Sequence, residues 1–410
     1  MKSTYKRLGN YIREIKVRNS EQKVEKLLGI NIDKFFMPSV ANVIGTDLSV
    51  YKVVSKNQFA CNRMHVGRDY RLPISMSKFE EEFIVSPAYD VFEIIDKSQL
   101  DPEFLMLWFS RREFDRNAWF YTDADVRGGL PWKSFCDMQL PIPSITKQRE
   151  IVKEYNTIQK RIELNQQLIQ KLEETAQAIY KQWFMEFEFP DETGKPYKSN
   201  GGEMVWNEEL GKEIPKGWEI SDLDTEYDIT IGRTPPRVEE EWFNSSDDSF
   251  DWISIKDLAS CDTFIFSTNE KLTSKAVKKF SIPKIPVNTT ILSFKMSVGK
   301  LAITTKEMLS NEAIAHFKIK QNSRLTSEFI YCFLDCYKFN ALGTTSSIVD
   351  SINTKMIKEI DILIPEKNII ELFQKIISNT FSLKKAKELE NQKLIELNKL
   401  QLSRIATTEK

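Results

Sequence analysis

The hydrophobic and polar positions between residues 144 and 189 follow a helical period over a longer stretch than anywhere else in the chain. Ser144 or Thr146 can cap the start of this helix, and Pro190 ends it. A helix of about 40 residues would be roughly 60 Å long, which is more than one globular domain of this size needs. The sequence therefore predicts a long spacer helix, whose heptad seam consists of Tyr155, Ile158, Ile162, Asn165, Ile169, Leu172, Ala176, Ile179 and Trp183.

A second helical stretch follows Pro365, but its apolar positions are less regular because Lys387 and Glu390 interrupt them. The string Asn-Gln-Gln-Leu-Ile that begins at Asn165 in the first helix returns as Asn-Gln-Lys-Leu-Ile at Asn391. A buried Asn at a seam position can set the register of two helices, so Asn165 and Asn391 can pair, although solvation or contact with a partner subunit is an equal alternative. The predicted seam of the second helix consists of Phe373, Ile376, Leu383, Leu389, Leu394, Leu397 and Leu400.

The repetition extends well beyond the helices. Residues 130–140 match residues 352–362, and residues 100–104 match residues 325–329, each of which opens an aromatic-rich helix. His65-Val66-Gly67 has an echo in Ser297-Val298-Gly299, which is typical of a tight turn between strands. The chain is therefore predicted to be a tandem duplication.

Each half of the duplication reads as an α+β globular module followed by one long helix. Alternating apolar residues predict strands within residues 48–54, 83–95, 250–255, 289–295 and 313–319, and a helix over residues 102–116. If the two long helices pack antiparallel, the modules stand at opposite ends of the rod and are related by an approximate two-fold axis. The predicted segments are a first module (1–143), a spacer helix (144–189), a linker (190–215), a second module (216–365) and a second spacer helix (366–410).

The composition argues against several classes of protein. The net charge is -1, so any affinity for nucleic acid must come from local patches or from partner subunits. Five scattered cysteines and two histidines indicate neither a disulfide framework nor a zinc site. The chain shows no signal peptide and no apolar run of about 18 residues, so we expect a cytoplasmic protein that does not enter a membrane.

We find no catalytic motif. A glycine-rich phosphate loop of the P-loop type does not occur. Residues 86–89, Ser-Pro-Ala-Tyr, come close to the motif with which amino-methyltransferases hold a flipped base, but the second proline and a glycine-rich cofactor loop are missing. A turn that enters a strand is therefore the favoured interpretation, and no catalytic or metal-binding residue is predicted.

Basic and polar residues beside glycines and prolines are the candidates for DNA contact. A glycine turn presents neighbouring side chains together, to phosphates or to base edges. Solvated surface charge remains an alternative for each residue by itself. The candidates are Arg63, His65, Arg68, Arg71, Arg127 and Lys133 in the first module, and Arg233, Arg237, Lys295, Lys300, Thr344, Ser346 and Ser347 in the second.

Aromatic residues gather at the end of the first long helix, at Tyr180, Trp183, Phe184 and Phe187. A lone rod cannot bury so many aromatic side chains. They either pack on the linker or anchor a partner subunit.

The order module, helix, module, helix resembles the specificity subunits of type I DNA restriction-modification systems along nearly the whole chain. Several strings are similar to that family: residues 59–69 and 125–129 in the first module, residues 199–204 and 214–218 at the entry to the second, and residues 251–254 and 282–292 in its body. The resemblance implies a non-catalytic DNA reader in which each module is a target-recognition domain for one half of a bipartite asymmetric site.

The same resemblance implies the partners. The two helices would fix the spacing of the half-sites on double-stranded DNA and grip two methyltransferase subunits, which motor-nuclease subunits then join. S-adenosylmethionine, ATP and magnesium would be bound only by those partners, so no cofactor is expected in this chain.

Two other classes of protein stay open as alternatives. The chain can be a non-catalytic coiled-coil scaffold that joins two protein-binding modules, or, less well supported, a DNA methyltransferase or fused modification enzyme, which would need the missing motifs. DNA binding that depends on base sequence separates a specificity subunit from a scaffold.

Overall fold

The computed structural model of the chain describes residues 5–39, 45–64, 66–122, 128–244, 248–295, 297–339 and 352–405. These residues form two units. Unit 1 comprises Met1–Ile162 and Lys393–Lys410, and unit 2 comprises Glu163–Gln392. The two long helices, α5 (Ile145–Tyr180) and α11 (Lys367–Arg404), each have one part in either unit. Within the described residues, no helix combines the length and the hydropathy that a membrane span requires.

Unit 1 is built around a four-stranded antiparallel sheet in the order β2-β9-β6-β7. Smaller antiparallel pairs, β1-β10, β3-β4 and β5-β8, lie around it. The core is rich in phenylalanine, and the ring of Phe92 stacks on Phe59 with centroids 5.1 Å apart. The elements are β1 (Tyr5–Arg7), β2 (Ile12–Ile15), β3 (Leu28–Ile30), β4 (Phe36–Pro38), β5 (Lys52–Val54), β6 (Phe59–Cys61), α1 (Val66–Asp69), β7 (Ile74–Met76), β8 (Phe83–Val85), β9 (Asp90–Ile94), α2 (Pro102–Phe109), α3 (Arg112–Phe120), α4 (Trp132–Asp137) and β10 (Gln139–Pro141).

The single helix predicted over residues 102–116 is wrong, because two helices meet at Arg111. Asp101 caps α2 by accepting hydrogen bonds from the backbone N–H groups of Glu103 and Phe104, and Pro102 occupies its first turn. Arg111 adopts an extended backbone, with φ -78° and ψ 143°, and so ends one helix before the next begins. The break gives α3 a new direction, in which Phe114 and Ala118 face the core.

Unit 2 contains a five-stranded sheet in the order β14-β21-β18-β19-β16 and a three-stranded sheet in the order β17-β15-β20. Two further antiparallel pairs, β11-β12 and β13-β22, complete it. The elements are β11 (Met204–Asn207), β12 (Lys212–Pro215), β13 (Glu219–Asp222), α6 (Leu223–Glu226), β14 (Tyr227–Ile231), β15 (Ser249–Ile253), α7 (Ile255–Ser260), β16 (Phe264–Ile265), β17 (Glu270–Thr273), α8 (Ser274–Lys279), β18 (Thr290–Ser293), β19 (Leu301–Thr304), β20 (Leu309–Ser310), β21 (Ile314–Ile319), α9 (Ser327–Cys336), α10 (Thr354–Lys358) and β22 (Asp361–Ile364).

The two units share a common topology. The antiparallel order β2-β9-β6-β7 in unit 1 returns as β14-β21-β18-β19 in unit 2. In each unit, a strand near the start pairs antiparallel with the strand that directly precedes the long helix, β1 with β10 and β13 with β22. Likewise α2 and α4 occupy the places in the chain order that α9 and α10 take in unit 2. The duplication that the short sequence matches predict is therefore visible in the strand order.

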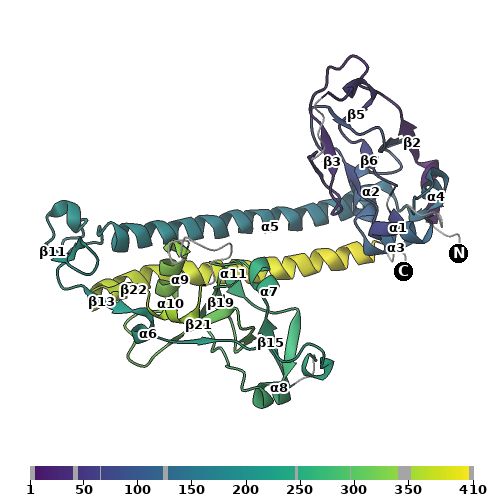
Figure 1. The fold of residues 1–410 in the computed structure, drawn as a ribbon. Coiled ribbons are helices and arrows are strands. Elements are labelled where there is room, and N and C mark those ends of the chain that lie inside the picture. The colour runs from purple at the N-terminus through teal and green to yellow at the C-terminus, as the bar shows by residue number, and fades with distance from the viewer. Residues whose placement is uncertain are drawn as a thin grey trace. The chain divides into compact units, whose positions relative to one another are not determined.

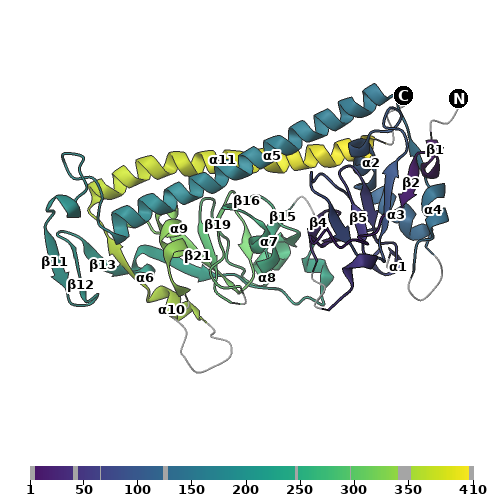
Figure 2. The same ribbon diagram turned by 90° about the horizontal axis from the view of Figure 1, so that it is seen from above.

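In unit 2, α5 and α11 lie side by side and run in opposite directions (Figures 1 and 2). Asn165 of α5 donates a hydrogen bond from Nδ2 to Oδ1 of Asn391 at 2.9 Å, and both side chains are buried. Further along α5, the ring of Tyr180 meets that of Phe373, which lies earlier in α11. Because later residues of α5 contact earlier residues of α11, the two helices are antiparallel. All predicted seam residues of α5 are buried or half-buried.

The predicted seam of α11 is largely wrong. Leu397 is 45% exposed, and Ile376, Leu383, Leu389 and Leu400 are also exposed. Phe373 is buried as predicted, and Leu394 is half-buried. The buried residues of the helix are instead Ile369, Ile370, Phe373, Ile377, Phe381, Lys384, Glu388, Asn391 and Asn398.

The buried face of α11 carries charged side chains, which apolar periodicity does not predict. Lys384 pairs with Glu173 of α5. Glu388 accepts hydrogen bonds from the backbone N–H groups of Thr263 and Phe264, at 3.2 and 2.8 Å. Burial raises the pKa of Glu388 to about 7 and lowers that of Lys384 to about 8. Polar side chains therefore fasten the rest of unit 2 to the helix pair at positions where a coiled coil would carry leucine.

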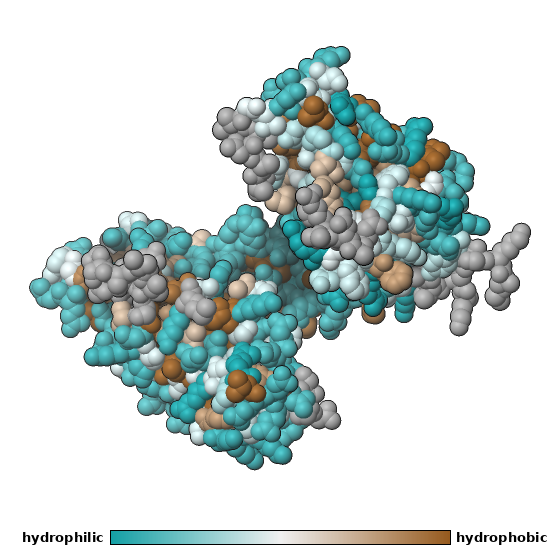
Figure 3. Space-filling view, turned by 45° about the vertical axis from the view of Figure 1, so that its right-hand side comes forward, coloured by the Kyte–Doolittle hydropathy of each residue, from teal (hydrophilic) through white to brown (hydrophobic). Residues whose placement is uncertain are grey.

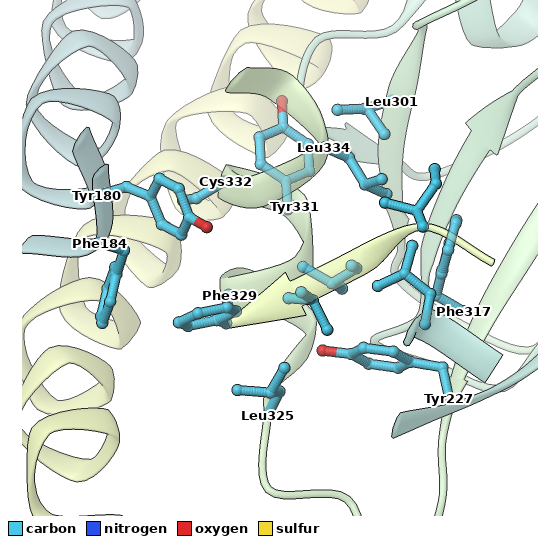
Figure 4. Packing of buried hydrophobic residues seen from close by; sticks show 14 of the residues in the cluster. Tyr180, Phe184, Tyr227, Leu301, Phe317, Leu325, Phe329, Tyr331, Cys332 and Leu334 are labelled. Carbon is cyan, nitrogen blue, oxygen red and sulfur yellow. The ribbon is translucent and has the colours of Figure 1, made fainter. Parts of the chain in front are cut away.

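The aromatic residues at the end of α5 pack within unit 2. Tyr180, Trp183, Phe184 and Phe187 are all buried, and a π-helical turn (Lys181–Met185) extends α5. Figure 4 shows Tyr180 and Phe184 beside Phe329 of α9, and the rings of Phe184 and Phe329 lie 4.9 Å apart. Phe187 contacts Trp218 beyond the linker at 5.5 Å. These side chains therefore pack within the chain, but their ring partners Phe329, Phe373 and Trp218 lie outside the predicted linker, so these ring contacts are not the predicted packing on the linker.

Candidate nucleic-acid interface

The predicted echo between residues 65–67 and 297–299 lies in equivalent connections of the two units. Residues 62–73 join β6 to β7 in unit 1, and residues 294–300 join β18 to β19 in unit 2. The second connection is a tight turn in which Gly299 has a φ of 90°. The first instead contains the short helix α1, so the predicted turn at Gly67 is wrong in conformation although it is right in place.

A second segment approaches each of these connections. In unit 1, the backbone N–H of Gly67 donates to the carbonyl of Gly128 at 2.8 Å, and a methyl group on Gly67 would lie 2.6 Å from the Gly128 Cα. In unit 2, a methyl group on Gly299 would lie 3.5 Å from the ring of Phe339. Gly128 precedes α4 and Phe339 precedes α10, so both units bring together the same two parts of the fold.

Five predicted contact residues, His65, Arg127, Thr344, Ser346 and Ser347, lie outside the described residues. The two contacts just described are made by Gly67, Gly128 and Phe339. Each of these three residues lies within two positions of a segment that contains one or more of the five candidates.

The candidate basic residues of unit 1 differ in how free their side chains are to contact DNA. Arg63 is mostly buried: its Nε donates to Asp90 at 2.6 Å, and its guanidinium also bonds the carbonyl of Leu130 and lies 5.5 Å from the Trp132 ring. This network fixes the connection and leaves Arg63 little freedom to meet DNA.

The other described candidates of unit 1, Arg68, Arg71 and Lys133, are exposed. Arg68 lies on α1 and pairs with its neighbour Asp69 at 2.7 Å, a hydrogen bond that raises the pKa of the guanidinium. Arg71 pairs with Asp33 at 2.6 Å, at the end of the same connection. Lys133 lies on α4, directly after the segment that contacts Gly67. Exposed ion pairs of this kind are worth at most about 1 kcal/mol, so a phosphate can replace the carboxylate as the partner of the arginine.

Two candidates in unit 2, Lys295 and Arg237, form a cluster around Glu312. Lys295, in the β18–β19 connection, and Arg237 both lie near this carboxylate, which also accepts a hydrogen bond from Thr234. The Thr234 hydroxyl and, more weakly, the two cations hold the pKa of Glu312 below its usual range. Lys300 is exposed in the same connection as Lys295.

Arg237 is held in a defined orientation. It pairs with Glu270 at 2.6 Å, and its guanidinium lies over the rings of Phe243 and Trp252 at 4.7 and 4.8 Å. Arg233 is exposed and donates to the carbonyl of Phe280 at 3.0 Å. A stacked arginine beside a paired carboxylate is pre-organised for planar recognition of a base edge or a phosphate.

Sequence reasoning missed two features of these surfaces. No local signal marks Glu312 as a neighbour of Thr234 and Arg237, because the β14–β21 pairing brings these distant segments together. The exposed aromatic residues Tyr70, Trp119, Phe120 and Tyr121 also went unnoticed, and the rings of Tyr70 and Trp119 lie 5.4 Å apart beside α1. In the view of Figure 3, hydrophobic residues lie as separate patches among hydrophilic ones.

A hydroxyl–imidazole pair in unit 2 is buried. Ser310 Oγ lies 2.6 Å from Nε2 of His316, while Nδ1 of His316 lies 3.1 Å from the Thr230 hydroxyl. Both Ser310 and His316 are fully buried, and burial lowers the pKa of His316 to about 3. The neutral imidazole therefore links β21 to β14 and β20 and has no access to a substrate. Among the described residues, no group of His, Cys, Asp and Glu is arranged to hold a metal ion.

Comparisons with known proteins agree on one family. Residues 215–399 match the family model described as the type I restriction modification DNA specificity domain. The specificity subunit of the type I restriction enzyme HindI from Haemophilus influenzae is 25% identical over 92% of both chains. The MjaIX specificity subunit from Methanocaldococcus jannaschii is 25% identical over 74% of this chain and 66% of its own.

A solved structure shows the same fold. The S subunit of a type I restriction-modification system from M. genitalium aligns with a TM-score of 0.56 and 12% identity, and the alignment covers 98% of this chain and 95% of the other. The family match and the two relatives confirm the resemblance drawn from the sequence, and the shared fold agrees with it: residues 215–399 carry the DNA specificity domain of type I restriction-modification systems.

Proposed function

We propose that the chain reads a bipartite, asymmetric site on double-stranded DNA, with one half-site for each module. The β6–β7 connection and the segment before α4 would contact one half, and the β18–β19 connection and the segment before α10 the other. The observation that carries the proposal is that exposed candidates, Arg68 and Arg71 in unit 1 and Lys295 and Lys300 in unit 2, lie in equivalent connections of a duplicated fold. Duplicated readers whose side chains have diverged, as His65 and Ser297 have in the sequence, would recognise different half-sites.

We further propose that α5 and α11 form an antiparallel spacer, about which the modules are related by an approximate two-fold axis. The contact between Asn165 and Asn391 supports this, since the two are equivalent positions of the repeat. Equivalent residues touch where a two-fold axis passes between them. The modules would then meet DNA at a separation that the helices set.

The chain would act without catalysis of its own. Two methyltransferase subunits would dock on the helices, and motor-nuclease subunits would join them. S-adenosylmethionine, ATP and magnesium would bind to those partners. The exposed apolar residues of α11, such as Leu383 and Leu397, support a docking surface because a free helix gains nothing from exposing them.

The proposal predicts that Arg237→Ala weakens recognition of one half-site only. We expect methylation at the cognate site to fall about tenfold or more and to tolerate base changes in the half-site read by unit 2, because a pre-organised arginine is worth about 1–3 kcal/mol of discrimination. The measurement is the methylation rate of a panel of duplexes by the chain assembled with its methyltransferase.

Lys284→Ala is the matched control for Arg237→Ala. Lys284 pairs with Glu307 at 2.8 Å and lies over the Phe250 ring at 4.3 Å. Lys284→Ala therefore removes an ion pair and a cation–ring contact, as Arg237→Ala does, but outside the Glu312 cluster. If both variants methylate the panel like the parent, Arg237 does not read DNA.

A second prediction concerns Gly67 in unit 1. In Gly67→Ala, the added methyl group would meet the Gly128 backbone at 2.6 Å, which must displace one of the two segments at a cost of about 1–3 kcal/mol. We expect slower methylation through weaker recognition of the half-site read by unit 1, with the other half-site unaffected.

Gly129→Ala provides the control, since a methyl group on Gly129 would lie 3.9 Å from its nearest neighbour, the carbonyl oxygen of Arg63. Equal methylation by Gly67→Ala and the parent would exclude the β6–β7 connection from the interface.

A further inference from the structure

Unit 1 contains a pocket of about 520 Å³, and Arg71 is the one DNA-contact candidate among its described lining residues. Its wall is formed by the start of α3, by Arg71 and the segment after β3, and by the last turns of α11. The lining residues are Ile32, Asp33, Lys34, Arg71, Ser110, Arg111, Arg112, Glu113, Asp115, Lys399, Leu402 and Ser403.

The lining carries five cationic and three acidic side chains. All three acids are engaged: Asp115 accepts from Lys34 at 2.8 Å, Asp33 from Arg71 at 2.6 Å, and Glu113 lies 3.4 Å from Arg111. Among the described residues, no ion pair involves Arg112 or Lys399. The positive charges of Arg112 and Lys399 are therefore not balanced by any acidic side chain of the described pocket lining.

Arg111 gives the pocket a buried donor without a partner. Its side chain is only 4% exposed, and its guanidinium stacks on the Trp108 ring at 4.4 Å. Among the described residues, its Nε has no hydrogen-bond acceptor. Buried N–H groups are almost always paired, so an unpaired one on a pocket wall indicates that a ligand supplies the acceptor.

The N-terminus of α3 opens at the same wall. Arg111 is its N-cap residue and makes no side-chain capping hydrogen bond, and Arg112 and Glu113 form the first turn. The first backbone N–H groups of a helix have no partner within the helix and carry a partial positive charge. Such a terminus binds anions, and here it acts beside an orphaned guanidinium N–H and two unbalanced cations.

We propose that this pocket binds a phosphate group. A phosphate offers the acceptor oxygens that Arg111 Nε and the α3 terminus lack, and its two negative charges match the unbalanced charges of Arg112 and Lys399. The crowding of cations on the wall supports this proposal. Burial lowers the pKa of Lys34 most, and repulsion from the nearby Arg71 lowers it further. The phosphate can belong to the DNA backbone or to a free phosphate compound, because both present the same oxygens.

The test is thermal unfolding of the full chain with inorganic phosphate as the probe, against sodium chloride of equal ionic strength. We expect phosphate to raise the Tm above the chloride value, since a ligand that binds only the folded state stabilises it. The pocket variant Arg112→Gln/Lys399→Gln should bind phosphate at least tenfold more weakly.

Arg116→Gln/Lys393→Gln is the matched control, because it removes the same two charges from the same two helices outside the pocket lining. A parent chain that responds equally to phosphate and chloride overturns the proposal, as does a pocket variant that binds phosphate as tightly as the control variant. Both variants replace exposed side chains, so neither depends on disturbing the buried Arg111.

Duplex DNA then identifies the source of the phosphate. If the DNA backbone supplies it, the pocket variant binds every sequence more weakly than the control variant, and inorganic phosphate competes with DNA. If a free compound supplies it, the two variants bind DNA equally while their phosphate affinities still differ. Because phosphate binding is measured without DNA, its failure would leave the proposed function untouched.

Discussion

Phe373→Ala is expected to lower the free energy of unfolding by about 3–5 kcal/mol, because it removes a fully buried ring from the centre of unit 2. Phe373 lies on α11 and contacts the rings of Phe184, Phe329 and Trp183, at centroid distances of 4.9, 5.8 and 5.9 Å. These partners belong to the end of α5 and to α9. One ring therefore holds the two long helices and the second module together.

The measurement is chemical denaturation of the full chain, monitored by tryptophan fluorescence. Leu383→Ala is the control on the same helix. Apolar periodicity places Leu383 in the seam beside Phe373, whereas the structure leaves it 41% exposed. We expect the control to cost less than about 1 kcal/mol. A loss from Leu383→Ala as large as that from Phe373→Ala would contradict the observed face of α11.

The architecture could be predicted because its signals are local. Short repeated strings revealed the duplication, and uninterrupted heptad spacing identified the seam of α5. The same method failed on α11, where Lys384, Glu388 and Asn391 are buried. Their partners Glu173, Thr263 and Asn165 lie far away in the sequence, so periodicity alone marks these positions as solvated.

The candidate interface was predictable only in part. The glycine echo led to equivalent connections in the two units, since a glycine at a close backbone approach leaves a signature in the sequence. The sequence carries no such signature for the individual roles of the arginines. Arg63 resembles Arg68 in its surroundings along the chain, yet strand β9 places Asp90 against Arg63 and buries it. Glu312 reaches the cations of unit 2 through strand pairing, which no local pattern reveals.

The second large effect is expected from lengthening both helices. Inserting three heptads at Lys160 in α5 and at Glu396 in α11, at the same distance along each helix from the Asn165–Asn391 contact, preserves the pairing of the two seams. The insertion adds about 31 Å, close to one turn of DNA at roughly 34 Å, so both modules would again face the same groove. The gap between half-sites should lengthen by about nine base pairs.

Insertion into α5 alone provides the control. It leaves the Asn165–Asn391 and Tyr180–Phe373 contacts in register, but it shifts the start of α5 and the sheet of unit 1 relative to the end of α11, where Ile405 is buried in the core of unit 1. We therefore expect loss of stability and no methylation at either spacing. Stable, active protein from this variant would show that the helices do not act as a pair.

Genome-wide mapping of methylated sites, in cells that carry the lengthened chain with its methyltransferase, tests most directly whether a helical rod sets the distance between two DNA readers. The expected result is a motif with both original half-sites and a gap longer by about one DNA turn. A motif that keeps its original gap, or one in which the bases of a half-site change, would contradict it.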